Sequence, residues 1–304
     1  LQQGVDRSLR KDQRGSFHCG EEQLVLLSAL QESTRVCAKS HDLKNDRNRD
    51  LSPTYFPCEW LRVSSMLLSR KKEKANHFRQ QMRRCNQLHV EYMTDEHLRK
   101  SYEHFVDWQL AYILPLFGDL YARDGYAEAI DFTMSDLAGI GISNRDRDLE
   151  RAAPAITTIL PLRALTTVAD TAEVNARVLE INIAIWRRLI AENDQSAQIT
   201  EYSYCIACRE ASSFGECLNL VHKITALGKT LKSLIEVPMI GLTLRAMKAP
   251  AHAAGFGALQ EFLETGFYTF RQIPDVDHFL AEIEIHMIEI FKRIYTAPLD
   301  QLRR

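Results

Sequence analysis

The stretch from Gly255 to Tyr295 constrains the fold most, because it contains two amphipathic helical patterns separated by a short turn. In its first part apolar residues recur three and four positions apart, a spacing that forms one stripe on a helix. Gly266 falls in this stripe, where the missing side chain predicts close approach of another backbone. After Pro274 the same spacing resumes from Val276 to Ile294. A connection this short favours antiparallel neighbours, so the stretch predicts a terminal helical hairpin.

Similar helical patterns occur along most of the chain, while strand signals are weak. With 13 glycines and 9 prolines in 304 residues, the chain is also poor in the turn residues that an all-β fold requires. We therefore predict an all-α fold, a multi-helix bundle-like globular protein. At roughly 100–200 residues per domain, the length fits one large domain or two closely packed helical lobes.

We expect residues 1–20 to form a flexible N-terminal segment, residues 21–137 an N-terminal helical lobe, and residues 145–304 a C-terminal helical lobe that ends in the hairpin. The glycine-containing turn between the lobes, residues 138–144, marks the expected boundary. The main helices expected before the hairpin are Glu21–Lys39, Cys58–Glu91, a helix with Thr94 as its N-cap, Leu165–Ala191, and Gln198–Leu227, which Gly228 ends.

The composition limits the compartment and the partners. No apolar run approaches the ~20 residues of a membrane span, so we expect no transmembrane segment. The first fifteen residues are polar and have no secretory signal pattern, although a targeting segment removed earlier would leave no trace. Seven cysteines, an odd number, do not indicate a disulfide framework, and we expect a reducing, cytoplasmic compartment. The 38 basic and 40 acidic residues nearly balance, so the overall charge does not by itself imply a nucleic-acid partner.

Four residues form the sharpest candidate metal site, namely Cys205, Cys208, Cys217 and His222. Thiolate and imidazole ligands suit tetrahedral zinc. However, few turn residues separate the ligands, and on one continuous helix Cys217 and His222 do not converge with Cys205 and Cys208. A Cys-x-x-Cys pair can also be a redox site at the start of a helix. The competing interpretation is that these cysteines are buried core residues.

A second set combines glutamates and histidines at helical spacing. Glu96-His97 and Glu103-His104 recur seven residues apart, and Glu282, His286 and Glu289 share one helical face. A helical bundle can hold iron with such groups, but the usual di-iron bundle needs Glu-x-x-His pairs, and that spacing does not occur in this sequence. The alternative is a solvent-exposed face stabilised by side-chain pairs four residues apart.

The stretch from Arg70 to Arg84 contains seven basic residues and one acidic residue. Such a stretch can contact nucleic acid or an anionic membrane surface. On a helix, however, these residues spread around much of the circumference, which is typical of an ordinary solvent-exposed helix surface.

No complete catalytic motif is present, so whether the protein is an enzyme stays open at this stage. The leading hypothesis is a helical interaction protein, or one that binds a small apolar ligand. The first alternative is a metal- or thiol-dependent helical enzyme that uses zinc, iron or the cysteines. The second is a phosphate or anionic-membrane-surface binder that uses Arg70–Arg84.

Overall fold

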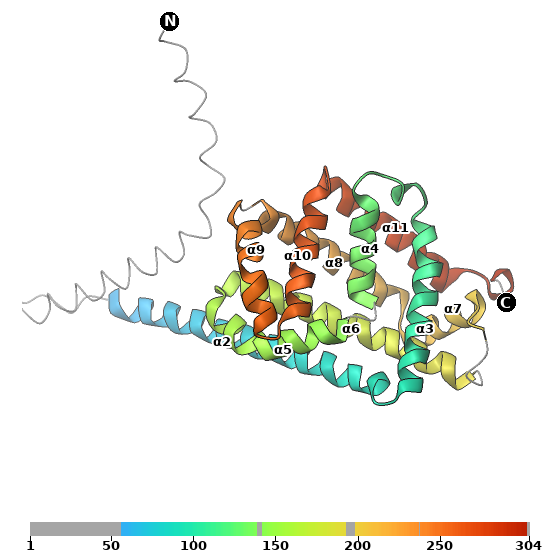
Figure 1. Cartoon of the computed structure of the whole chain (residues 1–304), viewed down its shortest axis with the longest axis horizontal. Helices are drawn as coiled ribbons and strands as arrows, with labels where there is room; N and C mark the ends of the chain where they lie inside the picture. Colours follow the sequence, from blue (N-terminus) through green and yellow to red (C-terminus); the bar gives the residue numbers. More distant parts are fainter. Residues whose placement is uncertain (1–55, 139–141, 193–197, 237, 303–304) are drawn as a thin grey trace, which may run out of the picture. The chain divides into compact units, whose positions relative to one another are not determined.

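The computed structural model describes residues 56–138, 142–192, 198–236 and 238–302. Within these ranges the chain forms α-helices and short 3-10 segments without a strand, so the all-α prediction is confirmed (Figure 1). The α-helices are α2 (Phe56–Met93), α3 (Glu96–Ile113), α4 (Tyr126–Ala138), α5 (Ile142–Ile159), α6 (Leu162–Glu192), α7 (Glu201–Ala211), α8 (Phe214–Ile235), α9 (Pro238–Ala253), α10 (Gly257–Gln272) and α11 (Val276–Thr296). The 3-10 segments are η2 (Leu114–Leu120) and η3 (Leu299–Gln301).

The chain divides into two compact units, residues 1–61 and residues 62–304. Of the first unit, the structure describes the beginning of α2. The predicted flexible segment 1–20 and the predicted helix Glu21–Lys39 lie outside the described residues. In the second unit the helices on the two sides of the expected lobe boundary, α4 and α5, contact each other and both contact α10. The division into lobes 21–137 and 145–304 stays a prediction.

One face of α2 enters the core from Ala75 onward. Its buried residues alternate at spacings of three and four, the pattern of a helix that packs lengthwise on a neighbour. They are Ala75, Phe78, Met82, Cys85, His89 and Tyr92, and Gln81 is buried beside Met82. Near the end of α2, Tyr92 stacks on Tyr102 of α3 with ring centroids 4.0 Å apart, and Trp186 of α6 meets Tyr102 edge-on at 5.6 Å. These aromatic contacts join three helices in the core.

A ladder of polar contacts shows that α2 and α6 run parallel. Lys74 pairs with Asp170 at 3.0 Å and His77 with Glu173 at 3.0 Å. Two further rungs pair Arg84 with Glu180 and Glu91 with Arg187. In every rung the α6 residue comes 96 positions after its α2 partner, and a constant offset requires two helices that run in the same direction.

The last two helices form where the sequence predicted them, but the predicted hairpin packing is wrong. α11 lies along α8, and α10 lies along α9, so the two diverge after their connection (Figure 1). A Cβ atom on Gly228 of α8 would lie 2.6 Å from a methyl group of Leu280 of α11, which shows how closely these helices approach. Gly266 faces the Phe132 ring of α4 rather than another backbone. The amphipathic stripes predicted burial correctly without identifying the neighbour.

Two predicted helix ends also differ. Asp95, not Thr94, caps α3, because its carboxylate accepts hydrogen bonds from the backbone N–H groups of His97 and Leu98. The helix expected over Gln198–Leu227 is two helices, α7 and α8, separated at Ser212 and Ser213. α8 continues past Gly228 to Ile235, because glycine inside a packed helix costs only about 1 kcal/mol. None of the helices in the described part of the chain is long and apolar enough to cross a membrane.

Candidate functional site

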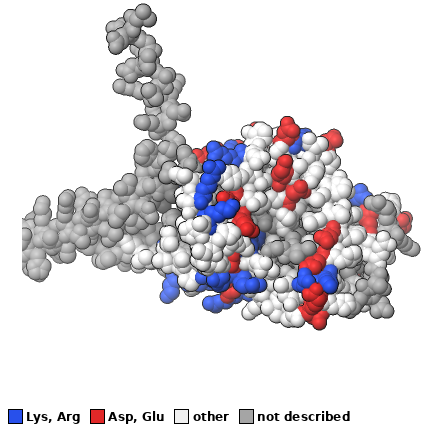
Figure 2. Space-filling model, viewed as in Figure 1, with Lys and Arg blue, Asp and Glu red and all other residues white. Residues whose placement is uncertain are grey.

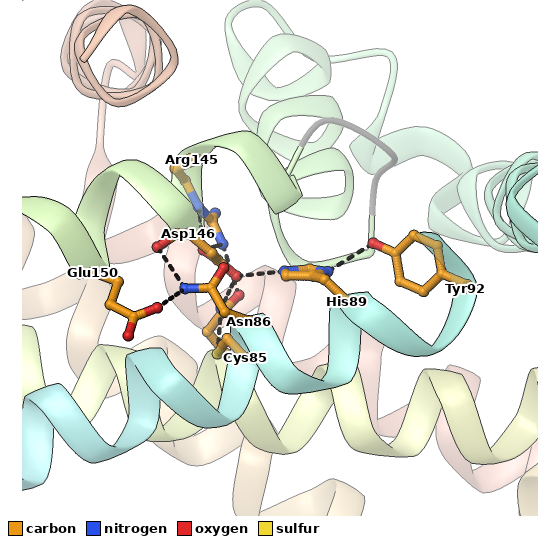
Figure 3. Close-up of polar contacts among 8 residues, drawn as sticks. Cys85, Asn86, His89, Tyr92, Arg145, Asp146 and Glu150 are labelled. Carbon is orange, nitrogen blue, oxygen red and sulfur yellow. Dashed lines mark hydrogen bonds and ion pairs between the residues drawn. The ribbon is translucent and has the colours of Figure 1, made fainter. Parts of the chain in front are cut away.

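The most concentrated polar chemistry in the described residues lies where α2, α5 and α6 meet. Asp146 of α5 is at its centre and is 0% exposed (Figure 3). α2 contributes Cys85 and His89 to its surroundings, and α6 contributes Asn175. An isolated buried carboxylate is strongly unfavourable, so its partners determine whether this arrangement is stable.

Both carboxylate oxygens of Asp146 have partners. The guanidinium of Arg145 donates to Oδ1 from Nε at 2.9 Å and from Nη2 at 2.7 Å. Nδ2 of Asn175 donates to Oδ2 at 3.1 Å, and Nε2 of His89 lies 2.9 Å from the same oxygen. Burial opposes ionisation of Asp146, but the hydrogen bond from His89 and the charge of Arg145 outweigh it and hold the pKa of this carboxyl below its usual range.

The ring of His89 bridges Asp146 and Tyr92. A carboxylate only accepts hydrogen bonds, so Nε2 of His89 is the donor to Asp146. Nδ1 lies 2.7 Å from the hydroxyl of Tyr92, a group that can donate or accept a hydrogen bond (Figure 3). The ring of His89 thus contacts both neighbours, beside the ion pair of Arg145 with Asp146.

The network extends along α5 on both sides of Asp146. Nδ2 of Asn86 donates to the backbone oxygen of Asp146 at 3.2 Å and to Glu150 at 2.7 Å. Arg145 also lies over the ring of Phe262, with its guanidinium carbon 5.0 Å from the ring centroid. These contacts connect α2, α5 and α10 around one buried charge pair.

A histidine hydrogen-bonded to an aspartate beside a cysteine resembles the parts of a nucleophilic site. Here the parts are closed to solvent, since His89 is 4% exposed and Cys85 is fully buried. Burial, with the nearby charge of Asp146, raises the pKa of the Cys85 thiol to about 12, so the reactive thiolate is rare at neutral pH. The geometry therefore fits a structural network that orients three helices.

The candidate metal ligands are only partly brought together. Cys205 and Cys208 of α7 and Cys217 of α8 are buried. The hydroxyl of Tyr295 lies 3.3 Å from the Cys217 sulfur and donates to the Cys208 carbonyl at 3.1 Å. Burial raises the pKa of the Cys205 and Cys208 thiols. His222 is instead exposed and lies 3.5 Å from Glu284 of α11. No group of three or more His, Cys, Asp or Glu side chains that could hold a metal ion occurs among the described residues.

The glutamate and histidine set is likewise dispersed. His97 and His104 are exposed on α3. His286 donates from Nδ1 to the carbonyl oxygen of Glu282 on its own helix at 2.8 Å. Among the described residues these side chains do not form a group that could hold a metal ion.

Several residues of the basic stretch Arg70–Arg84 bind α5 and α6. Lys74 and Arg84 form rungs of the α2–α6 ladder. Lys71 donates to the Thr158 carbonyl at 3.0 Å, and Arg79 donates to the Thr157 hydroxyl at 2.6 Å. The stretch therefore stabilises helix packing, which leaves fewer of its cations available for phosphate.

The sequence interpretation missed the Asp146 network, although a signal was present. Asp146 follows Ile142 by four residues and precedes Leu149 by three, so it lies on the apolar stripe of α5. His89 occupies the corresponding position between Cys85 and Tyr92 on α2. A charged or polar residue on a helix's apolar stripe indicates a buried polar contact, because unpaired burial is unfavourable.

The fold and this network define a mainly helical protein whose polar core is closed to solvent. Residues 88–300 match the family described as Domain of unknown function (DUF8198), and the chain belongs to that family. The match begins inside α2 and ends in η3, so it includes His89 and Asp146 but not Cys85. No curated protein and no solved structure matches the chain.

Proposed function

We propose that this protein is a non-catalytic helical interaction protein that binds a partner helix along the N-terminal half of α2. One observation carries the proposal. Leu68 precedes Ala75 by seven residues, so it occupies the core-facing position of α2, yet it is 69% exposed. From Ser65 to Arg70 the helix is exposed at every position. The apolar face that is buried further along α2 is therefore left exposed here by the part of the chain that the structure describes.

The helix ladder shows that only the first turn of α6 lies beside this face. With a constant offset of 96, the first residue of α6, Leu162, lies beside residue 66 of α2 (162 − 96 = 66). By the same offset Leu67 and Leu68 lie beside Arg163 and Ala164, in the first turn of α6. A helix of a partner protein that covers the exposed sides of Leu67 and Leu68 would continue the packing that α6 provides further along.

A second exposed apolar side chain lies on the same side. Ile159, at the end of α5, is 74% exposed. Its neighbour Thr158 accepts the hydrogen bond from Lys71, which follows Leu68 by three residues on α2. We call Leu67, Leu68 and Ile159 the α2 patch. Arg70 and Lys72 are exposed beside it, so an apolar helix stripe flanked by acidic residues is the partner chemistry that fits.

The test introduces a photo-crosslinking amino acid at position 68 of the full chain and, as a control, at position 285. Ile285 is also an exposed apolar residue, but it lies on α11. A protein crosslinked from 68 alone is then purified and titrated directly. We expect Leu68→Gln to weaken its binding by about ten-fold or more, as truncation of a central apolar anchor does, and Ile285→Gln to leave it unchanged. Equal weakening by both variants, or no partner specific to position 68, would contradict the proposal.

A cytoplasmic location belongs to the same proposal. Cys85, Cys205, Cys208 and Cys217 are all free thiols, which agrees with a reducing compartment.

A further inference from the structure

The exposed face of α9 is unusual because it is apolar and without charge. Leu242 is 61% exposed and Met247 is 49% exposed. The other exposed residues around them on this face are small or uncharged, namely Thr243, Ala246, Ala249, Pro250 and Ala253. We call this set the α9 face. In Figure 2 basic side chains are seen on the part of the surface where Figure 1 places α9.

The packing of α9 explains why this face points outward. α9 and α10 are antiparallel neighbours, and a Cβ atom on Gly241 would lie 2.9 Å from the ring of Phe267. The side chain of Gln260 donates to the Leu244 carbonyl at 2.7 Å. Gly241 and Leu244 thus lie on the side of the helix that meets α10, and the α9 face lies on the opposite side.

The charges that border this face are basic. No Asp or Glu occurs between Glu236 and Glu261, whereas Arg245, Lys248 and His252 lie within that interval. Arg245 lies beside the face and donates to the hydroxyl of Tyr268 of α10 at 2.7 Å. Lys248 follows Gly241 by seven residues, so it lies on the side that meets α10, where it is 3.1 Å from Glu264. An uncharged apolar face opposite a polar side that carries cations is the arrangement of a helix that lies in a membrane interface.

We infer that α9 is a binding site for an anionic lipid surface, on which it lies flat with Leu242 and Met247 inserted among the lipids. The complementary charge is on the lipid headgroups, which attract Lys and Arg near the surface. A protein groove is the less favoured occupant, because most residues of the face are small and offer few of the large anchors that such grooves bind. The inference is independent of the α2 patch, which lies on other helices.

The test measures co-sedimentation of the full chain with two kinds of vesicle, pure phosphatidylcholine and phosphatidylcholine with about one third phosphatidylserine. We expect binding to the anionic vesicles that weakens at high salt. Leu242→Gln with Met247→Gln should reduce the partition coefficient by about ten-fold or more, because apolar area is lost. The matched control, Ile285→Gln with Leu299→Gln, also alters two exposed apolar residues and should leave binding unchanged.

A charge variant separates the electrostatic contribution to lipid binding from the apolar contribution. Arg245→Gln with Lys248→Gln should weaken binding to the anionic vesicles by roughly five-fold for each cation and leave any binding to neutral vesicles unaltered. Circular dichroism and melting confirm that each variant is folded. The inference is overturned if the wild-type chain does not bind the anionic vesicles, or if the control pair weakens binding as much as the α9 pair. It is also overturned if the α9 pair abolishes a lipid-independent dimer, because the face would then bind a second copy.

Discussion

Replacing Asp146 with asparagine tests whether the buried network holds α2, α5 and α6 together. The substitution preserves shape but removes the charge that faces Arg145, whose side chain is itself almost completely buried. It also places an amide donor or a weaker acceptor where Arg145, His89 and Asn175 now meet carboxylate oxygens. Removing one partner of a buried ion pair typically costs about 3–5 kcal/mol, so we expect Asp146→Asn to lower the free energy of unfolding by about 3 kcal/mol or more.

The matched control is Asp170→Asn, which removes the same charge from a pair on the surface. Asp170 pairs with Lys74 at 3.0 Å, but its side chain is about half exposed. Exposed pairs contribute about 0–1 kcal/mol, so this variant should be nearly as stable as the wild type. Urea unfolding at neutral pH measures the stability of both variants. A loss of about 3 kcal/mol corresponds to a shift of the urea midpoint on the order of 1 M or more. Losses of similar size in the two variants would refute the reasoning.

Asp146→Asn should also change how the free energy of unfolding depends on pH. The pKa of Asp146 is lower in the folded protein than in the unfolded chain, where it is about 3.9. Its contribution to stability is therefore complete well above that unfolded value and is lost as the pH falls through the folded value. Unfolding free energies from neutral pH down to acid should decrease less steeply for Asp146→Asn than for the wild type. Parallel curves would show that Asp146 does not gain stability by ionising in the folded state.

Two further predictions concern backbone geometry and thiol chemistry. Gly125→Ala should lower stability by about 1–3 kcal/mol, because Gly125 has φ +75° and an added Cβ would lie 2.9 Å from the Gln272 carbonyl oxygen. Gly215→Ala, at a helical position with open space, should be neutral or stabilising by up to about 1 kcal/mol, and urea unfolding of both checks the contrast. Cys85 should react with a thiol reagent at pH 8 far more slowly in the native protein than in urea, because burial raises the pKa of its thiol. Peptide mapping after labelling measures the extent of reaction at Cys85. Fast labelling of Cys85 in the native protein would contradict the prediction.

Much of the fold could be predicted from local pattern. The apolar stripes indicated α2, α6, α10 and α11 with nearly correct ends, because one side of each helix must be buried. The break between α7 and α8 was missed, since Ser212 and Ser213 are only weak helix-ending signals. The partners of α10 and α11 were also missed, because a stripe shows which side of a helix is buried and not which helix covers it.

The contacts of the candidate site could not be predicted from local pattern either. Arg145 and Asp146 stand in a charged run that suggests a solvent-exposed surface, and only the position of Asp146 on the apolar stripe contradicts that interpretation. His89 and Asp146 are 57 residues apart in the chain. Their contact depends on the crossing angle between α2 and α5 and on the position along each helix where the two meet. Neither quantity is encoded within either segment alone.

The sequence by itself determined that the chain is helical and which side of each main helix is apolar, because helix periodicity and burial act over a few residues. Tertiary structure decided the rest: that Lys74 and Arg84 bind α6, that Asp146 is paired inside the core, and that Leu68 and Leu242 stay exposed. An ion pair or an apolar contact requires two surfaces to meet within a few ångströms. Only the packing of the whole chain determines which surfaces meet and which remain exposed.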